Sequence, residues 1–341
     1  MPYTETCQRL LRLINRFPAR KVVVIGDLIA DEFLYGQIAR VSREAPVLVL
    51  EYRDLIRVPG GAGNAANNLL DLGCHVTMVG AVGYDEAGTD LLKILASKHA
   101  DVQHVRKVKS YRTPVKTRIL AGAHHSSRQQ VVRVDRGDSL DSSAFWKRGL
   151  PAGVAREADA VILSDYQYGA IEPTLLSGIV QTATRNGIPV VVDSRFRMVE
   201  FRGVTAITPN ITELEAAVGT TIGGNAALLH QVCRKVLRRQ KLECLLVTQG
   251  RFGMTLFQPR KPSRHIPIFG TDQVADVTGA GDTVISVFTL ALACGGSYED
   301  AALLANYAGG IVVMKRGTAT VTDAELRQAI EQNLLSEAKA Q

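Results

Sequence analysis

The chain has 341 residues, of which 46% are hydrophobic and 21% charged, so it can bury a large core as one or two domains. This composition excludes a disordered or fibrous protein, and no apolar run approaches the roughly 20 residues of a membrane span. The net charge of +7 suits anionic small molecules, and the 6% aromatic content argues against a surface that stacks single-stranded nucleic acid. We therefore expect no nucleic-acid or membrane partner. The N-terminal segment lacks an apolar secretion signal, which predicts a cytoplasmic protein.

Short β-branched runs alternate with helical stretches along the whole chain. Runs that are apolar on both faces are typical of parallel strands covered by helices. The alternation predicts a single α/β domain over residues 1–341, with a doubly wound, mostly parallel sheet flanked by helices. The expected strands are Val22–Ile25, Val76–Val79, Ala160–Leu163, Pro189–Val192 and Leu245–Val247, and the expected helices are Ala62–Leu72, Ala87–Lys98, Pro173–Arg185, Ala226–Arg239, Ala280–Ala293 and Tyr298–Val313.

Two stretches break this rhythm with strand-like runs that no helix separates. They contain Val47–Tyr52 and, later, Val115–Leu120 followed by Gln130–Val134. We interpret them as a small antiparallel sheet inserted into the α/β body. Formed by segments near 33–55 and 106–135, it would lie beside the carboxyl ends of the parallel strands and act as a lid.

The strongest local motif is Asp276-Val277-Thr278-Gly279-Ala280-Gly281-Asp282, which leads into a helix of small and apolar residues. Glycines let backbone N–H groups approach an anion, and the helix N-terminus adds about half a positive charge. Asp282, in the first turn, could then accept the proton of an attacking hydroxyl during phosphoryl transfer. Helix capping alone would explain the same residues about as well.

A second glycine-rich motif, Pro59-Gly60-Gly61-Ala62-Gly63-Asn64, opens a helix that also carries Asn68. Asn64 and Asn68 lie one turn apart and can offer amides to the hydroxyls of a polyol. The same stretch satisfies a dinucleotide fingerprint at Gly61, Gly63 and Ala66, but Arg57-Val58-Pro59 before it is a poor central strand.

Polar residues follow several of the predicted strands. Asp27 and Asp31 come after the first strand, where carboxylates commonly hold substrate hydroxyls, although a solvated loop is the simpler alternative. Glu213 begins a helix, and Thr212 lacks the spacing for a capping box with it, which favours a role in organising metal or water. Thr248 precedes a loop with Gly250 and Gly253, which could border a nucleotide or form a hairpin turn.

Six of the thirteen residues from Arg106 to Arg118 are basic. Most of them are expected on a solvated face. Lys116 and Arg118 alternate on one face of a predicted strand and could clamp a phosphate. The chain has no Gly-x-x-x-x-Gly-Lys-Ser/Thr motif, so any kinase here uses another phosphate cradle.

The ordered set of motifs resembles the ribokinase or PfkB sugar-kinase family over residues 20 to 330. The matching segments are Gly26-Asp27, Gly60-Gly61-Ala62-Gly63-Asn64, Asn210-Ile211-Thr212-Glu213 and Asp276 to Asp282. Within the family, the segments 40–47, 163–166 and 276–285 are most similar to the kinases that phosphorylate D-glycero-β-D-manno-heptose 7-phosphate at C1, on the route to ADP-heptose for the lipopolysaccharide core.

This resemblance implies a ribokinase-like fold whose β lid often forms a homodimer, and MgATP as the donor for a sugar hydroxyl. It assigns Asp282 as catalytic base and the N–H groups of Gly279, Ala280 and Gly281 as anion hole. It also implies roles for the following residues: Asp27, Asp31, Gly61, Asn64 and Asn68 with the sugar; Asn210 and Glu213 with phosphates and hydrated Mg²⁺; Thr248, Gly250, Gly253 and Asn306 with the nucleotide; and Asp276 with a monovalent cation such as K⁺. We further predict that Arg118 and Arg133 contact the phosphate of the sugar.

Three positions depart from the heptose-kinase pattern. Arg43, Tyr168 and the tripeptide Asp193-Ser194-Arg195 stand where proline, lysine and Asp-Pro-Lys are expected. They leave another sugar or sugar phosphate open as acceptor. No residues follow Gln341 for the nucleotidyltransferase half of bifunctional relatives, so a stand-alone kinase is expected. A dinucleotide-dependent oxidoreductase and a non-catalytic sugar sensor remain the alternatives from other classes.

Overall fold

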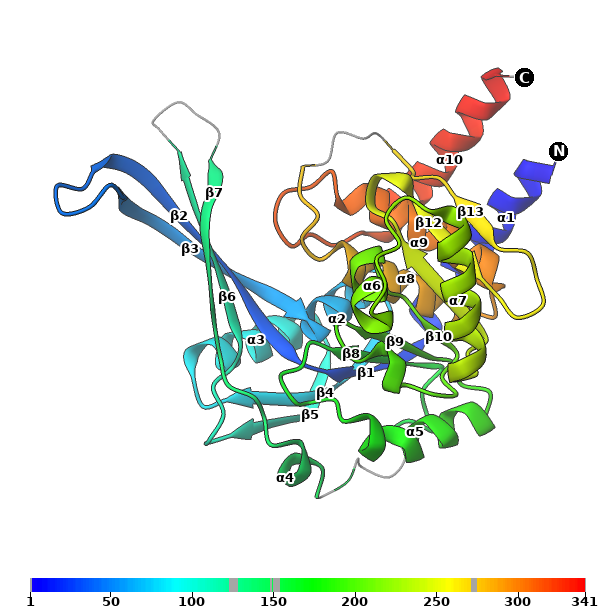
Figure 1. The fold of residues 1–341 in the computed structure, drawn as a ribbon, viewed down its shortest axis with the longest axis horizontal. Coiled ribbons are helices and arrows are strands. Elements are labelled where there is room, and N and C mark those ends of the chain that lie inside the picture. Colours follow the sequence, from blue (N-terminus) through cyan, green and yellow to red (C-terminus); the bar gives the residue numbers. More distant parts are fainter. Residues whose placement is uncertain (1, 123–127, 148, 150–153, 271–274, 341) are drawn as a thin grey trace.

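A large sheet covered by helices and a small projecting sheet form the framework of the molecule (Figure 1). The computed structural model describes residues 2–122, 128–147, 149, 154–270 and 275–340. Among these, no helix combines the length and hydropathy of a membrane span. All five cysteines are buried, and the described residues contain no disulfide bond.

The large sheet has the strand order β13-β12-β11-β10-β9-β8-β1-β4-β5. Its strands pair in parallel, except that β12 and β13 add to one edge as antiparallel strands. All five predicted parallel strands fall in this sheet, which confirms the predicted architecture. The strand bounds are β1 Lys21–Gly26, β4 His75–Gly83, β5 Asp101–Val108, β8 Ala160–Asp165, β9 Val190–Ser194, β10 Ala206–Ile207, β11 Cys244–Thr248, β12 Met254–Phe257 and β13 Arg264–Ile266.

Helices cover both faces of the large sheet because side chains alternate along its strands. In β1, Val22 and Val24 belong to one buried cluster, and Val23 and Ile25 belong to the other. The first cluster includes α1 Pro2–Ile14, α2 Ala62–Asp71, α3 Glu86–Ser97, α8 Ala280–Ala293, α9 Tyr298–Val312 and α10 Asp323–Ala340. The second includes α4 Ser142–Trp146, α5 Pro173–Arg185, α6 Ile211–Val218 and α7 Ala226–Gln240.

The small sheet extends away from the helical body as the predicted lid (Figure 1). Its order is β3-β2-β6-β7, with β2 Leu28–Val41, β3 Leu48–Gly61, β6 Val115–Gly122 and β7 Gln129–Arg136. The predicted small sheet is confirmed: β2 pairs with β3 and β6 pairs with β7 in the expected antiparallel sense, whereas β2 and β6 pair in parallel.

The lid also has different bounds from those predicted near 33–55 and 106–135. Its first hairpin begins at Leu28 and continues to Gly61, and residues 106–108 belong to β5 of the large sheet. Residues 123–127, inside the second predicted segment, lie outside the described part of the chain. Because β2 starts two residues after β1 ends, Asp27 and Asp31 lie where the two sheets meet.

Candidate active site

One cavity gathers most of the residues predicted for catalysis and nucleotide binding. Its volume is about 360 Å³, and it lies where the carboxyl ends of β9 and β11 face the beginning of α8. The predicted residues that line it are Asn210, Glu213, Thr248, Gly250, Gly253, Gly279, Ala280, Gly281, Asp282 and Asn306.

The first turn of α8 forms one wall of this cavity. Gly279, the N-cap, has φ of 80°, and a Cβ there would lie 2.5 Å from the Asn64 amide nitrogen, so only glycine fits. A Cβ on Gly281 would meet nothing within 4 Å, which leaves space beside the backbone for a ligand. The Ala280 N–H, predicted to bind an anion, instead donates to the Val277 carbonyl at 3.2 Å. The Thr283 N–H likewise donates to the Gly279 carbonyl at 3.1 Å. The N–H groups of Gly281 and Asp282, for which the described residues supply no backbone acceptor, are therefore the donors left for an anion.

Asp282 is 4% exposed and accepts two hydrogen bonds at 2.8 Å. The Asn64 amide donates to Oδ2, and the Tyr166 hydroxyl donates to Oδ1. Burial raises the pKa of Asp282 to about 6, against the opposing effect of these two donors. A carboxylate with this pKa is ionised at neutral pH and is suited to accept a proton.

The two asparagines of α2 have different surroundings from those predicted. Asn64 reaches Asp282, but Asn68 lies behind it and is fully buried. The Asn68 amide donates to the Asn64 carbonyl at 2.9 Å, and its own carbonyl accepts from the Thr283 hydroxyl at 2.9 Å. The prediction that Asn68 contacts the sugar was therefore wrong, because its polar atoms are used to hold α2 against α8.

Asp27 also differs from its predicted role with the sugar. It is fully buried, and its carboxylate accepts from the backbone N–H groups of Tyr166, Tyr168 and Ala170 at 2.8–3.0 Å. Burial raises the pKa of Asp27 to about 6 despite these bonds. Its carboxylate shapes the loop after β8, so the prediction of a substrate contact is corrected.

Asp31 and Arg118 form a buried ion pair at 2.7 Å across the lid strands β2 and β6. The Thr318 hydroxyl donates to the second Asp31 oxygen at 3.1 Å, and Gly60 packs closely against the carboxylate. Gly61, at φ of 56°, turns the chain from β3 into α2 directly above the Asp27 carbonyl. Arg118 thus neutralises Asp31, which differs from its predicted binding of a sugar phosphate.

Arg133 lies on the exposed strand β7 and pairs with Asp135 at 2.8 Å. Strand register places it directly opposite Arg118, on the same face of the lid. To contact a sugar phosphate as predicted, Arg133 would have to give up this exposed ion pair with Asp135.

Asn210 and Glu213 form a reciprocal capping box at the start of α6. The Asn210 side chain accepts from the Glu213 N–H at 2.8 Å, and Glu213 Oε2 accepts from the Asn210 N–H at 2.9 Å. The interpretation that capping does not involve Glu213 was therefore wrong: Thr212 lacks the spacing, but Asn210 has it. Both residues still line the cavity.

The cavity wall around Glu213 is rich in oxygen atoms. Asp193 lies nearby, and burial together with the charge of Glu213 holds the pKa of Asp193 well above its ordinary value. The Thr208 hydroxyl is buried and has no hydrogen-bond partner among the described residues. No cluster of three or more His, Cys, Asp or Glu side chains fit to hold a metal occurs within those residues. The donor set thus suits a hydrated Mg²⁺ held mainly by phosphates and water.

Asp276 fixes the loop that leads into α8. One oxygen accepts from the Thr278 N–H at 2.9 Å, and the other accepts from the Gly317 N–H at 3.0 Å. Its remaining lone pairs could still face a monovalent cation.

The side of the cavity predicted to border a nucleotide is built by β11, β12 and α9. A Cβ on Gly253 would lie 2.1 Å from the Ile266 carbonyl, so this turn between two antiparallel strands requires glycine. The Asn306 amide donates to the Pro267 carbonyl at 2.9 Å. The loop Thr248–Gly253 therefore forms a hairpin and lines the cavity at once, and the two interpretations of the sequence are compatible.

The dinucleotide fingerprint lacks its required context. The strand before Gly61 is β3, an edge strand of the small sheet, and not a strand of the parallel sheet. Pro59 is tolerated there because it lies in an edge strand. The structure therefore contradicts a dinucleotide site at Gly61, Gly63 and Ala66.

The sequence did not predict Tyr166 and Arg195 at the site, and both lie beside the predicted base together with Lys116, which was predicted as a phosphate clamp. The Tyr166 ring lies 4.9 Å from Lys116 Nζ and 4.5 Å from the guanidinium carbon of Arg195. Lys116 is 7% exposed, and neither cation forms an ion pair within the described part of the chain. The position of Tyr166 and Arg195, directly after β8 and β9, is the sequence signal that could have identified them.

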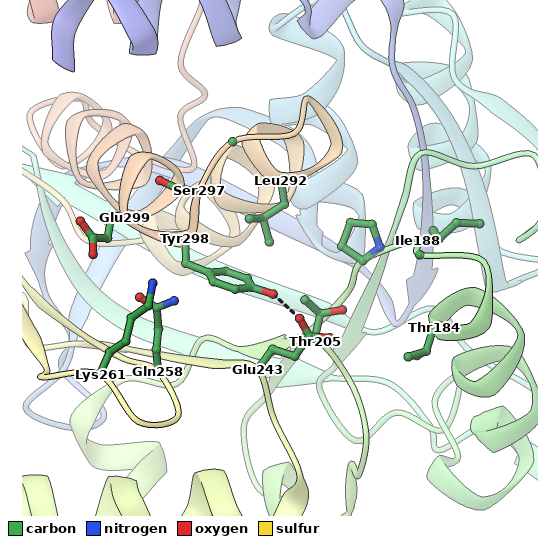
Figure 2. Close-up of a pocket in the computed structure, with 13 residues that line it drawn as sticks. Thr184, Ile188, Thr205, Glu243, Gln258, Lys261, Leu292, Ser297, Tyr298 and Glu299 are labelled. Atoms are coloured by element: carbon green, nitrogen blue, oxygen red, sulfur yellow. Dashed lines mark hydrogen bonds between the residues drawn. The ribbon is translucent and has the colours of Figure 1, made fainter. Parts of the chain in front are cut away.

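A larger cavity lies at the amino ends of strands β9, β10 and β11 (Figure 2). Its volume is about 660 Å³. It is lined by residues that precede β9, β10 and β11 and by the start of α9, including the hydrogen-bonded pair Tyr298 and Glu243. None of the predicted site residues lines it. Ligands of open α/β sheets bind at the carboxyl ends of the strands, which favours the smaller cavity as the active site.

Comparison with known proteins shows the family of the chain. The model of the family described as pfkB family carbohydrate kinase matches residues 19–325. The protein named Bifunctional protein HldE of Geobacter metallireducens is 43% identical over 313 residues, which cover 89% of this chain and 61% of that protein. The protein of the same name from Geobacter sulfurreducens is 41% identical, with 90% and 62% covered. This chain thus spans less than two thirds of the length of these relatives.

Solved structures show the same fold at low sequence identity. Arabidopsis thaliana ribokinase, complexed with ribose and ATP, superposes with a TM-score of 0.73 at 20% identity, covering 92% of this chain and 99% of that one. Phosphofructokinase-2 from Escherichia coli, in complex with potassium, gives a TM-score of 0.71 at 17% identity, covering 92% and 98%. The architecture is therefore ribokinase-like.

Proposed function

Because this chain belongs to the pfkB family of carbohydrate kinases, we propose that it transfers the γ-phosphoryl group of ATP to C1 of D-glycero-β-D-manno-heptose 7-phosphate. The product would serve ADP-heptose synthesis for the lipopolysaccharide core. The observation that carries the proposal is the placement of Asp282 directly after Gly281, in the first turn of α8, with both residues lining one cavity.

In this proposal Asp282 accepts the proton of the acceptor hydroxyl as that oxygen attacks the phosphoryl group. The helix N-terminus faces the negative charge that develops on the transferring group. Asn64 and Tyr166 hold the two carboxylate oxygens of Asp282 in place during the transfer. Asp31, at the junction of the two sheets, would accept hydrogen bonds from the sugar hydroxyls.

ATP and Mg²⁺ fit the residues that line the cavity. Thr208 offers a buried hydroxyl without a partner among the described residues, and Gly281 leaves open space at the helix terminus. Thr248, Gly250, Gly253 and Asn306 would border the nucleotide, and Asn210 and Glu213 would face its phosphates and the hydrated metal. When bound, Mg²⁺ neutralises charge on the phosphates. K⁺ near Asp276 remains a proposal that a dependence of turnover on the monovalent cation would support.

The acceptor phosphate needs a cation that is not already neutralised. Arg118 is paired with Asp31, and Arg133 is paired with Asp135. Lys116 is buried on the same face of the lid and has no ion-pair partner within the described residues. We therefore favour Lys116, with Arg195 close by, over the two arginines.

The exposed lid supports a further proposal, a homodimer formed through this sheet. Its outer strands expose Val131, Val132 and Val134 on β7 and Tyr52 and Ile56 on β3. Apolar side chains exposed on both edge strands of a projecting sheet are typical of an interaction surface. Cytoplasmic localisation is likewise a proposal, which rests on the expected use of ATP and a sugar phosphate.

A coupled assay of ADP release over free and phosphorylated sugars tests this function. We expect ATP-dependent turnover with heptose 7-phosphate, with a kcat/KM at least tenfold above that for unphosphorylated hexoses and pentoses. A preference for an unphosphorylated sugar would reject the heptose phosphate and retain a carbohydrate kinase. NAD reduction without ATP turnover would reject the kinase itself.

A further inference from the structure

Tyr166 is the only side chain besides Asn64 for which the described residues show a hydrogen bond to the Asp282 carboxylate. Its hydroxyl donates to Oδ1 at 2.8 Å, and it comes from the loop after β8, far in sequence from both α2 and α8. A hydrogen bond donated to the charged form of a carboxylate stabilises that form. Tyr166 therefore affects both the orientation and the protonation of the base.

The ring that carries this hydroxyl is held by cations from two other elements. Lys116 comes from β6 of the lid, and Arg195 follows β9 of the large sheet. A cation within about 6 Å of an aromatic centroid is attracted to the ring, more strongly where water is excluded. The backbone N–H of Tyr166 is fixed as well, since it donates to the buried Asp27 carboxylate at 2.8 Å.

The hydroxyl of Tyr166 remains protonated under working conditions. Loss of water around it and the negative charge of Asp282 hold the pKa of Tyr166 well above its ordinary value. The phenol is thus a permanent donor. The other groups near the base are Asn64, which donates a hydrogen bond, and the positive charge of Arg195. The carboxyl groups of Asp31 and Asp193 also lie near, and negative charge on either opposes ionisation of Asp282.

We infer that Tyr166 is a positioning residue for the base: its hydroxyl keeps Asp282 ionised and turned toward the acceptor, and its ring links the base to the lid through Lys116. This inference rests on the proposed function, because it takes Asp282 as the base. It adds that the lid is joined to the carboxylate indirectly, through the contact of Lys116 with the Tyr166 ring.

The test is the pH dependence of kcat in Tyr166→Phe, which keeps the ring and its cation contacts but removes the hydroxyl. Loss of one donor to the charged form should raise the pKa of Asp282, so the acid limb of the kcat profile should move up by about one pH unit. The KM for ATP should change less than threefold. The matched control is Tyr168→Phe in the same loop, for which we expect the wild-type profile.

A second variant keeps the test informative if Tyr166→Phe does not fold. Incorporation of 3-fluorotyrosine at position 166 makes the phenol more acidic and a stronger donor, and should move the acid limb down by a few tenths of a unit. A cooperative thermal melt confirms that each variant is folded. The inference is overturned if folded Tyr166→Phe and the fluorotyrosine protein both keep the wild-type acid limb, or if either shift has the opposite sign. Absence of ATP-dependent turnover in the wild type would instead reject the proposed function.

Discussion

Asn64 donates a 2.8 Å hydrogen bond to Asp282 across 218 residues of sequence. The bond joins the first turn of α2 to the first turn of α8, so the two glycine-rich motifs of the chain meet at one carboxylate. The close approach needs Gly279, where a Cβ would collide with the Asn64 amide.

Replacement of Asp282 by asparagine should remove the base and keep the shape of the site. We expect kcat to fall roughly 100-fold or more, because general bases commonly contribute 10²–10⁴. The KM values for ATP and acceptor should stay within about threefold. Steady-state kinetics with a coupled assay measure both. A loss of less than tenfold in kcat, with binding intact, would contradict the assignment of the base.

The pH dependence of the wild-type enzyme should report the pKa of Asp282. Burial raises this pKa to about 6, and only the ionised carboxylate accepts a proton. Turnover should therefore be flat above pH 7 and fall about tenfold per unit below about pH 6. Saturating substrates and a constant ionic strength isolate kcat from binding. An acid limb near pH 4 would show that burial does not control this group.

Glu213 combines a capping role with a proposed role near Mg²⁺, and two substitutions separate them. Glu213→Gln can still accept the bond from the Asn210 N–H, so the free energy of unfolding should change by less than about 0.5 kcal/mol. Its neutral amide attracts a hydrated cation less, and the Mg²⁺ concentration for half-maximal activity should rise about fivefold or more. Glu213→Ala should show the same Mg²⁺ effect and also lose about 1 kcal/mol of stability by urea unfolding. Equal Mg²⁺ curves for Glu213→Gln and wild type would exclude the metal role.

The acceptor phosphate can be located by comparing two lid cations. Lys116→Met removes a buried ammonium and keeps a chain of similar length, and should raise the KM for a phosphorylated acceptor about tenfold or more. Arg133→Met, on the same face but exposed and paired with Asp135, should change that KM less than threefold. The KM for ATP serves as internal control. If Lys116→Met lowered kcat for phosphorylated and free sugars alike, its charge would act on the transferred group and not on the acceptor phosphate.

The proposed dimer can be tested on the outer face of the lid. Val132 and Val134 lie on the face of β7 opposite to Arg133, and both are about half exposed. The double substitution to lysine should shift the molar mass measured by light scattering from dimer to monomer, because it places charge on the apolar surface. Val199→Lys, on an exposed residue outside the lid, is the control. A monomeric wild type would contradict the proposal.

The parallel sheet was predictable because its strands are short and apolar on both faces, as in Val22–Ile25. The length of the lid could not be predicted from the sequence. Strand β3 contains Glu51, Arg53, Asp54 and Pro59, whose polarity and geometry resemble a loop, and it is a strand only because β2 pairs with it.

The residues of the candidate site likewise fall into those that a local sequence pattern predicts and those that it does not. The helix start at Gly279 and the place of Asp282 in its first turn are encoded locally and were predicted from the sequence. The Asn210 capping box is equally local and could have been found from its spacing. The burial of Asp27 and Asn68 and the contact of Tyr166 with Asp282 depend on segments more than a hundred residues apart, which no local pattern reveals.

The rate at which the buried thiols react can report how often the core of this enzyme becomes accessible. Burial raises the pKa of Cys74 and Cys233 to about 12 and that of Cys294 to about 11, so the reactive thiolate is scarce as well as shielded. Alkylating reagents should leave the native enzyme active for long periods, and the rate at which each sulfur is labelled measures how often its part of the core becomes accessible. Mass spectrometry of the labelled peptides then distinguishes local openings from global unfolding without any engineered probe.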